Sequence, residues 1–204
     1  MSAAPNITDP ELATTLAAAG DDGAWRDAAK AALVARRELL RQRFDAGEAI
    51  DRLVSRCADA ADAVVRAAWQ RCLGDTPGLD LLATGGYGRG ELYPQSDIDL
   101  LVLAEPELQQ RHQVAIGRFF SLLWDAGLAT SQAVRSVGQC VEAAREDITV
   151  LTALMECRAL AGDPGAPKAL AAALAPTVLW PPSDYFHAKR EEQRARHARF
   201  NDTA

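Results

Sequence analysis

The chain has 204 residues, of which 49% are hydrophobic and 25% charged, and its formal net charge is −6. These values are typical of a globular protein with one core, and the acidic balance disfavours proteins that grip a nucleic-acid backbone. No apolar run reaches the roughly 18 residues that span a membrane, and the N-terminus lacks the basic start and apolar core of a secretory signal. The four cysteines are scattered without metal-ligand spacing, as is usual in a reducing compartment. We therefore expect a cytoplasmic protein whose partner is a protein or a small molecule, with no nucleic acid and no membrane.

The N-terminal part of the chain predicts helices. Residues 1–22 have no strong periodicity, so we expect a flexible leader that contains a short helix over Asp9–Ala19. From Gly23 to about Arg71, apolar residues recur at spacings of three and four, with one interruption at residues 45–47. Residues 23–75 are therefore expected to form a helical scaffold of two amphipathic helices.

The remaining chain predicts three strands and several helices. The strands are expected at Leu79–Thr84, Leu100–Leu103 and Leu128–Val137. The helices are expected at Glu105–Gly127, Val137–Arg145 (capped by Ser136), Ile148–Ala161, Lys168–Ala175 and Tyr185–Phe200. This order predicts an α/β, helix-rich α+β protein with its core at residues 76–137 and a C-terminal helical part at 138–204. The last helix ends a few residues before Ala204, so we expect a truncated chain.

A glycine-rich turn, Gly85-Gly86-Tyr87-Gly88-Arg89-Gly90, separates the first two predicted strands. At Gly85 and Gly86 the backbone N–H groups can approach phosphate oxygens closely, and a short helix from Tyr87 to Leu92 would favour an anion at its start. Arg89 is expected either to contact a phosphate or to be an exposed structural residue. Ser96 is expected either to donate to a phosphate or to cap the turn that follows.

Two carboxylates, Asp97 and Asp99, open the second predicted strand. Residues two apart in a strand point to the same side, so both can hold a divalent cation such as Mg²⁺ shared with substrate phosphates. The alternative is ordinary, since Asp-x-Asp is common in turns and caps. The better-known glycine motifs do not fit, because Glu91 stands where a Rossmann turn needs its third glycine and where a P-loop needs lysine.

The string GGYGRGELYPQSDIDLL resembles the N-terminal domain of the bifunctional PII uridylyltransferase/uridylyl-removing enzymes, within the polymerase-β-like nucleotidyltransferase superfamily. LLWDAGL, SVGQCVEAAREDITVLTALMECRALAGD and the closing KREEQRARHARFNDTA resemble the same family. The resemblance covers roughly Arg36 to Ala204. It implies a polymerase-β-like core with a small mixed sheet, and transfer of UMP from UTP to a tyrosine of the PII nitrogen-signalling protein with Mg²⁺ or Mn²⁺. Full-length members continue into a hydrolase domain and ligand-sensing domains, so this chain is expected to retain at most the transferase half.

Carried over to this sequence, the resemblance implies that Gly85 and Gly86 hold the triphosphate and that Asp97 and Asp99 bind metal and are catalytic. Lys189 in the last helix, with Arg196 and Arg199, is implied to reach the phosphates, although a solvated charged face is the alternative.

One departure concerns the third predicted strand. The superfamily often supplies a third carboxylate there to deprotonate the attacking hydroxyl, but LATSQAVRSV contains no Asp or Glu. The uridylyltransferases tend to show Gly-His-Ser-Val-Arg where this chain has Ser131-Gln132-Ala133-Val134-Arg135. The general base is therefore unassigned. Another acceptor, such as glutamine synthetase for an adenylyltransferase, or a non-catalytic nucleotide-sensing module, stays open.

Overall fold

The computed structural model describes residues 9–175 and 179–199 of the chain. The helices are α1 (Asp9–Ala17), α2 (Asp22–Asp45), α3 (Ile50–Cys72), α4 (Gly85–Gly88), α5 (Pro106–Arg111), α6 (Gln113–Asp125), α7 (Val137–Glu146), α8 (Ile148–Met155), α9 (Ala166–Ala173) and α11 (Pro182–Arg199). The strands are β1 (Asp80–Ala83), β2 (Ile98–Leu103), β3 (Thr130–Arg135) and β4 (Arg158–Ala161).

The strands form one mixed sheet of four strands in the order β3-β2-β1-β4. β1 pairs antiparallel with both of its neighbours, β2 and β4, whereas β2 pairs parallel with β3. A parallel pair needs a crossover connection, and α5 and α6 supply it between β2 and β3. The expected small mixed sheet with flanking helices is therefore confirmed.

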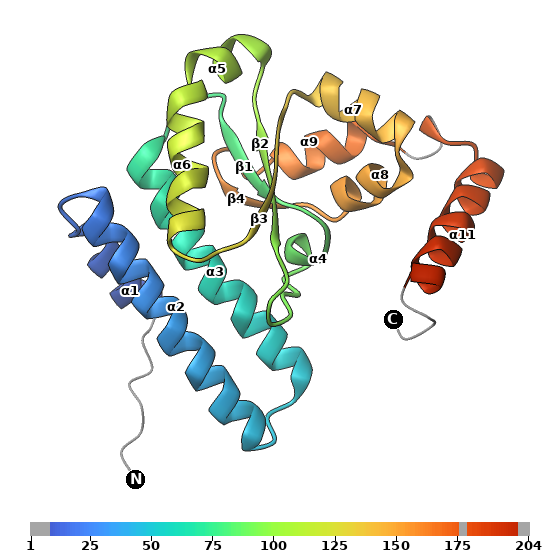
Figure 1. Cartoon of the computed structure of the whole chain (residues 1–204). Helices are drawn as coiled ribbons and strands as arrows, with labels where there is room; N and C mark the ends of the chain where they lie inside the picture. The colour runs from blue at the N-terminus through green and yellow to red at the C-terminus, as the bar shows by residue number, and fades with distance from the viewer. Residues whose placement is uncertain (1–8, 176–178, 200–204) are drawn as a thin grey trace.

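Helices cover both faces of this sheet (Figure 1). Alternate residues of β2 enter two separate cores: Leu100 belongs to the core shared with α3 and α6, and Leu101 to the core shared with α7, α8 and α9. A strand buried on both faces reads as a continuous apolar run, which is why the sequence LLVL shows no alternation. Asp99 lies on the same face as Leu101, toward α8.

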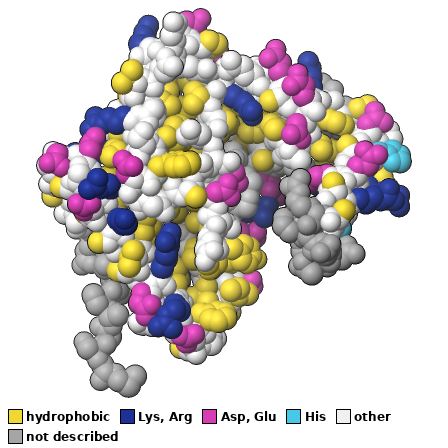
Figure 2. All heavy atoms as spheres, in the orientation of Figure 1, with side chains coloured by type: hydrophobic (Ala, Val, Ile, Leu, Met, Phe, Trp, Pro, Cys, Tyr) yellow, Lys and Arg dark blue, Asp and Glu magenta, His cyan; other side chains and the backbone are white. Residues whose placement is uncertain are grey.

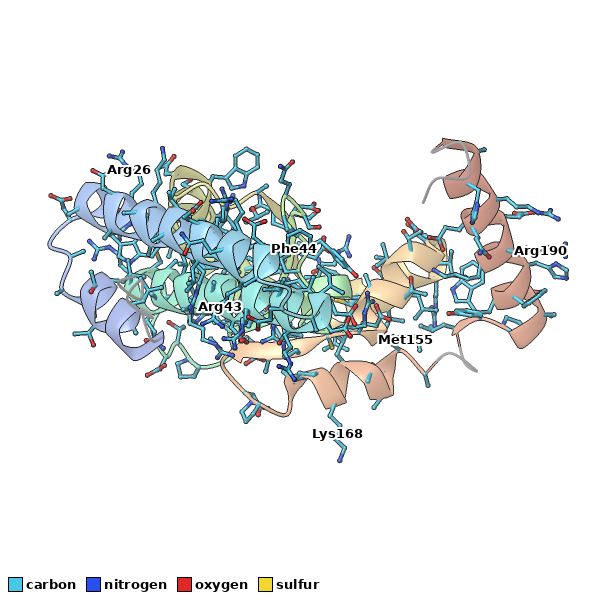
Figure 3. All side chains as sticks on the ribbon, turned by 90° about the horizontal axis from the view of Figure 1, so that it is seen from below. Arg26, Arg43, Phe44, Met155, Lys168 and Arg190 are labelled. Atoms are coloured by element: carbon cyan, nitrogen blue, oxygen red, sulfur yellow. The ribbon has the colours of Figure 1, made fainter. Side chains whose placement is uncertain are left out.

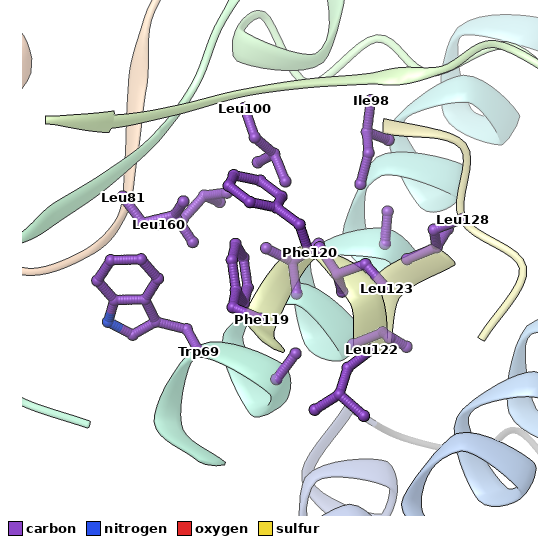
Figure 4. Packing of buried hydrophobic residues seen from close by; sticks show 14 of the residues in the cluster. Trp69, Leu81, Ile98, Leu100, Phe119, Phe120, Leu122, Leu123, Leu128 and Leu160 are labelled. Carbon is purple, nitrogen blue, oxygen red and sulfur yellow. The ribbon is translucent and has the colours of Figure 1, made fainter. Parts of the chain in front are cut away.

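Aromatic side chains fill the core between the sheet and α3 and α6 (Figure 4). The rings of Trp69 and Phe119 meet edge to face, with centroids 5.4 Å apart, and Phe120 adjoins Phe119 at 4.9 Å. Trp69 and Phe119 are almost completely buried. Edge-to-face packing of this kind stabilises an aromatic pair by about 1 kcal/mol beyond the burial of its area.

The N-terminal helices pack on the outer side of this core (Figure 1). The two helices expected over residues 23–75 correspond to α2 and α3, with the break between Asp45 and Ile50. The expected leader is packed from Asp9 onward, because Leu12 and Leu16 of α1 are buried in the main core. Residues 1–8 lie outside the described residues.

An ion-pair network ties the start of α2 to its neighbours. Asp22 accepts hydrogen bonds from Arg71 of α3 at 2.8 Å and from Arg118 of α6 at 2.7 and 2.8 Å. These bonds, chiefly those from Arg118, hold the pKa of Asp22 well below its usual value.

The prediction of one helix over Ile148–Ala161 is wrong. The helix ends at Met155, and Arg158–Ala161 forms β4, whose Ala159 pairs with Leu82 and whose Arg158 pairs with Ala83. The apolar spacing of this segment suits a helix, but pairing with the open edge of β1 overrides local propensity. β4 therefore places a second strand beside β1, and its first residue, Arg158, pairs with Ala83 just before the glycine turn.

Smaller differences concern element ends. The helix expected over Glu105–Gly127 is split at His112 into α5 and α6, and the short helix expected from Tyr87 to Leu92 lies at Gly85–Gly88 instead. Ser136 caps α7 as predicted, in a capping box with Gln139. The predicted end of the last helix at Phe200 lies outside the described residues.

Basic and acidic side chains are interspersed over the face drawn in Figure 2. At the right of that view, basic, acidic and histidine side chains lie close together. Within residues 9–175 and 179–199, none of the helices combines the length and apolarity that crossing a membrane requires.

Candidate active site

The glycine turn begins where β1 ends. The N–H of Thr84 donates to the carbonyl oxygen of Asp99 at 3.0 Å, and Gly85 then adopts a φ of +58°, which favours glycine. Gly88 makes the first hydrogen bond of α4, to the carbonyl oxygen of Thr84 at 2.9 Å. The N–H groups of Gly85 and Gly86 precede that bond, so the helix itself does not use them.

The two aspartates lie beside this turn. Asp97 is exposed just before β2, and Asp99 is half-buried as the second residue of the strand. A Cβ atom placed on Gly85 would lie only 3.3 Å from Oδ2 of Asp99. The structure therefore brings the predicted phosphate loop and the predicted metal ligands together at one end of β1 and β2.

A tight turn leads into Asp97. The N–H of Ser96 donates to the carbonyl oxygen of Tyr93 at 3.1 Å, with Pro94 second in the turn and Gln95 third at a φ of +70°. Proline followed by a residue with positive φ is the pattern of a type II turn, in which glycine is the usual third residue. Ser96 thus closes this turn through its backbone, and its side chain is exposed.

The electrostatics of Asp99 reflect its neighbours. Burial, and then the negative charge of Asp97, raise the pKa of the Asp99 carboxyl above its ordinary value, while a hydrogen bond from Ser131 opposes the rise. Ser131 is the β3 residue directly opposite Asp99 in the parallel pair. A hydroxyl therefore occupies the position beside Asp99 on the third strand.

The chemistry of this pair suits a divalent cation. Two neighbouring carboxylates, one of them half-buried, repel each other, and a cation bound to their oxygens would remove that repulsion. Within the described part of the chain, no group of three or more His, Cys, Asp or Glu residues could hold a metal ion. Two carboxylates without a full protein cage fit Mg²⁺ or Mn²⁺ shared with phosphate oxygens.

Arg89 is held by carboxylates at the end of α4. Its Nε donates to Oε2 of Glu91 at 2.9 Å, and its Nη1 donates to Oε2 of Glu156. The guanidinium also lies beside Gly86, since a Cβ there would be 3.6 Å from Nη2. These contacts give Arg89 a structural role, and its phosphate contact stays a prediction.

Comparison with known proteins agrees with this geometry. Residues 65–137, which contain the glycine turn and both aspartates, match the nucleotidyltransferase domain family. Residues 65–137 are thus recognised as a nucleotidyltransferase domain. Its helix-rich α/β architecture with a small mixed sheet agrees with the polymerase-β-like fold that the sequence predicts.

The nucleotidyltransferase domain lies within a longer similarity. The chain is 56% identical over 183 residues, 90% of its length, to the bifunctional uridylyltransferase/uridylyl-removing enzyme of Xanthomonas oryzae pv. oryzae (strain MAFF 311018). It is 55% identical over the same length to that of Xanthomonas euvesicatoria pv. vesicatoria. It is 46% identical over 168 residues, 82% of its length, to that of Pseudomonas aeruginosa (strain UCBPP-PA14). The resemblance stated from the sequence is confirmed, and the chain spans 19–21% of the length of these relatives.

Lys189 contacts α8, the helix that lies beside the glycine turn. Its Nζ is 3.5 Å from Oγ1 of Thr152 on α8, and it also bonds Glu192 within its own helix. The next residue of α8, Ala153, has its Cβ 4.0 Å from a Cβ built on Gly85. Lys189 and the glycine turn thus both contact α8, through neighbouring residues of that helix.

The other basic residues of α11 differ from Lys189. Arg190 points away from the rest of the protein (Figure 3). The side chains of Arg196 and Arg199 lie outside the described residues.

Sequence reasoning missed Glu156 and Arg158, which contact the glycine turn of the nucleotidyltransferase domain from about 70 residues away in the chain. They fall in the segment predicted as one continuous helix. An apolar pattern interrupted by Glu-Cys-Arg was the available signal, but such an interruption is equally compatible with the solvated face of a helix.

Proposed function

We propose that this chain transfers UMP from UTP to a tyrosine hydroxyl of the PII nitrogen-signalling protein. The tyrosine oxygen bonds to the α-phosphorus, the bond from that phosphorus to the α–β bridging oxygen breaks, pyrophosphate leaves, and the hydroxyl proton passes to solvent. The 56% identity to an enzyme named for uridylyl transfer supports the choice of nucleotide.

The observation that carries this proposal is the carboxylate pair beside a glycine turn. Asp99 Oδ2 lies 3.3 Å from the position of a Cβ on Gly85, so only a residue without a side chain leaves room there for a phosphate beside the carboxylate. A triphosphate on the N–H groups of Gly85 and Gly86 would present its oxygens toward Asp97 and Asp99.

Each site residue has a role in this proposal. Asp97 and Asp99 would hold Mg²⁺ or Mn²⁺, which supplies charge neutralisation for the attacked phosphate and the leaving pyrophosphate. Gly85 and Gly86 bind phosphate oxygens, and Lys189 adds positive charge from α11. Arg89 and Ser96 are expected at the edge of the triphosphate.

Removal of the tyrosine proton has no carboxylate from β3. The sequence TSQAVR offers Ser131 beside Asp99 instead. A tyrosine hydroxyl has an unperturbed pKa near 10, so at neutral pH it needs help to ionise. In this proposal Asp97 and Asp99 would hold a cation near the tyrosine, and its positive charge would favour loss of the hydroxyl proton.

The test is incubation with PII, labelled UTP and Mg²⁺, followed by detection of label on PII. Asp97→Asn with Asp99→Asn should abolish labelling, by more than about a hundredfold, because the charge that holds the cation is lost. The matched control is Glu105→Gln with Glu107→Gln, which removes the same charge at the far end of β2 and should label PII as the unchanged chain does (Figure 1). Labelling that survives in the aspartate variant would refute the proposal.

A second candidate is a nucleotide-binding module without transfer activity, and the hydroxyl of Ser131 where a carboxylate would serve as base favours it. Metal-dependent UTP binding without label on any acceptor would support that candidate. The same assay with labelled ATP and glutamine synthetase tests the adenylyl alternative. An adenylyltransferase should use ATP and not UTP, and a uridylyltransferase should use UTP and not ATP.

A further inference from the structure

The glycine turn cannot set its own position. α4 has four residues, three of which are glycine, and Tyr87 is its one side chain larger than hydrogen. Tyr87 is 2% exposed and anchors the turn in the core. One anchor fixes a point but not an orientation, so contacts from elsewhere must orient the N–H groups of this turn.

Arg158, the first residue of β4, supplies one such contact. Its Nη2 donates to the carbonyl oxygen of Tyr87 at 3.2 Å, and its guanidinium carbon lies 5.5 Å from the centre of the Tyr87 ring. The guanidinium is itself fixed by two hydrogen bonds to Asp62 of α3, at 2.5 and 3.0 Å. Arg158 therefore joins the main chain and the ring of Tyr87 to a carboxylate on the neighbouring helix.

Glu156 supplies the second contact. A Cβ atom on Gly88 would lie 1.8 Å from the carbonyl oxygen of Glu156, so the backbone of the α8–β4 connection touches the end of the turn directly. The side chain of Glu156 binds Arg89, the residue after α4. The connection from Glu156 to Arg158 thus contacts the turn at Tyr87, Gly88 and Arg89.

We propose that this connection positions the glycine turn for the triphosphate, with Arg158 as the positioning residue. The proposal builds on the function proposed above, because it assumes that the N–H groups of Gly85 and Gly86 bind phosphate. Loss of Arg158 lets the turn drift, which weakens the hold on UTP more than it slows the chemical step at Asp97 and Asp99.

Four variants separate positioning from folding. Arg158→Met removes the contact with Tyr87 but leaves the carboxylate of Asp62, 16% exposed, without its main partner. Arg158→Met with Asp62→Leu removes both charges of this pair, so no carboxylate is left without its main partner. It also removes the 3.7 Å pair of Asp62 with Arg66, which the Arg66→Met control tests separately. Arg158→Lys keeps the charge but cannot bind Asp62 and Tyr87 in one planar fork.

Arg66→Met is the matched control. Arg66 lies one helical turn beyond Asp62 on α3 and pairs with it at 3.7 Å. Its guanidinium donates to the carbonyl oxygens of Leu160 and Ala159 in β4. It joins the same helix to the same strand, and none of the hydrogen bonds described for it reaches α4.

Two readouts are measured on the whole chain. In UMP transfer to PII, Arg158→Met and the double variant should raise KM for UTP about tenfold, the effect of losing one charged hydrogen bond, while kcat changes less than about threefold. Arg158→Lys should fall between them and the unchanged chain, and Arg66→Met should not raise KM. In hydrogen–deuterium exchange without nucleotide, amides of residues 85–90 should exchange faster in Arg158→Met and in the double variant, whereas those of α2 should not.

The proposal is overturned if the double variant, folded, keeps both the KM and the slow exchange of residues 85–90. It is equally overturned if Arg66→Met reproduces the effects of Arg158→Met, since general packing of α3 on β4 would then explain them. An unchanged chain that transfers no UMP would defeat the proposed function instead, and amide exchange would still decide whether Arg158 orients the turn.

Discussion

Replacing Gly88 by alanine tests how closely the α8–β4 connection packs on the glycine turn. The added Cβ would lie 1.8 Å from the carbonyl oxygen of Glu156, 2.9 Å from its carbonyl carbon and 3.0 Å from the carbonyl oxygen of Ala83. All three atoms belong to the backbone, so no side-chain rotation can relieve the overlap.

The size of the effect follows from the shift required. An ordinary contact begins near 3.4 Å, so the connection must move by about 1.6 Å. A move of that size breaks the 3.2 Å bond from Arg158 to the carbonyl of Tyr87 and loosens the pairing of β4 with β1. Overpacking of this kind costs about 1–3 kcal/mol, and the lost bond adds about 1 kcal/mol. We expect a loss of about 3 kcal/mol in the free energy of unfolding.

Urea unfolding monitored by circular dichroism measures this loss, and calorimetric titration measures UTP binding. Gly117→Ala in α6 is the control, because a Cβ there meets no atom within 4 Å and alanine should stabilise the helix by up to about 1 kcal/mol. Gly88→Ala should also weaken UTP binding at least tenfold, or about 1.4 kcal/mol. If Gly88→Ala unfolds at the same urea concentration as the unchanged chain and binds UTP equally well, the packing described for the turn is incorrect.

Two further predictions concern the turn before Asp97 and the acid behaviour of the N-terminal helices. Gln95→Gly should raise the free energy of unfolding by about 0.5–1 kcal/mol, because glycine adopts the +70° φ without strain. As a control, Gln110→Gly in α5 should lower the free energy of unfolding by a similar amount. Thermal unfolding measures both variants, and destabilisation by Gln95→Gly would contradict the turn geometry. Asp22→Asn should cost at most about 1 kcal/mol at pH 7, since the side chain of Asp22 is 39% exposed and solvent screens its pairs with Arg118 and Arg71. Because the pKa of Asp22 is lowered in the folded state, its contribution is complete above the unfolded value near pH 4 and is lost as the pH falls further. Urea unfolding from pH 7 to pH 2 should therefore show the difference between the two chains shrinking below pH 4, and a difference as large at pH 2 as at pH 7 would exclude the ionic explanation.

The parts of the site that were predictable share one property: their function depends on local sequence. Gly85 and Gly86 follow a short apolar run, and Asp97 and Asp99 open another, so the strands and the turn between them could be placed without tertiary information. In the mixed sheet β1 pairs with β2, and the register of that pairing brings Asp99 beside Gly85.

The parts that were not predictable depend on pairing between distant segments. Arg158-Ala159-Leu160-Ala161 has no strong strand propensity, and it becomes β4 because β1 has an open edge and Leu160 has a place in the core. The carboxylates that hold Arg89 illustrate the same limit: Glu91 is two residues away, but Glu156 is separated by 67 residues. Periodicity reports which face of an element is buried and does not report which partner covers it.

The central place of β1 in the sheet has a consequence for how the molecule folds. β1 pairs with β2 through residues 84–97, which contain the glycine turn, but its other edge is covered only when β4 pairs with it. Arg158 and Asp62 are separated by 96 residues of chain. Contacts of such long range form late because closing the intervening loop costs entropy. The hairpin of β1 and β2 can therefore exist before its glycine turn is held, and a nascent chain that ends before residue 158 should bind no nucleotide. If the chain binds UTP as proposed, its affinity for the nucleotide should therefore report completed folding.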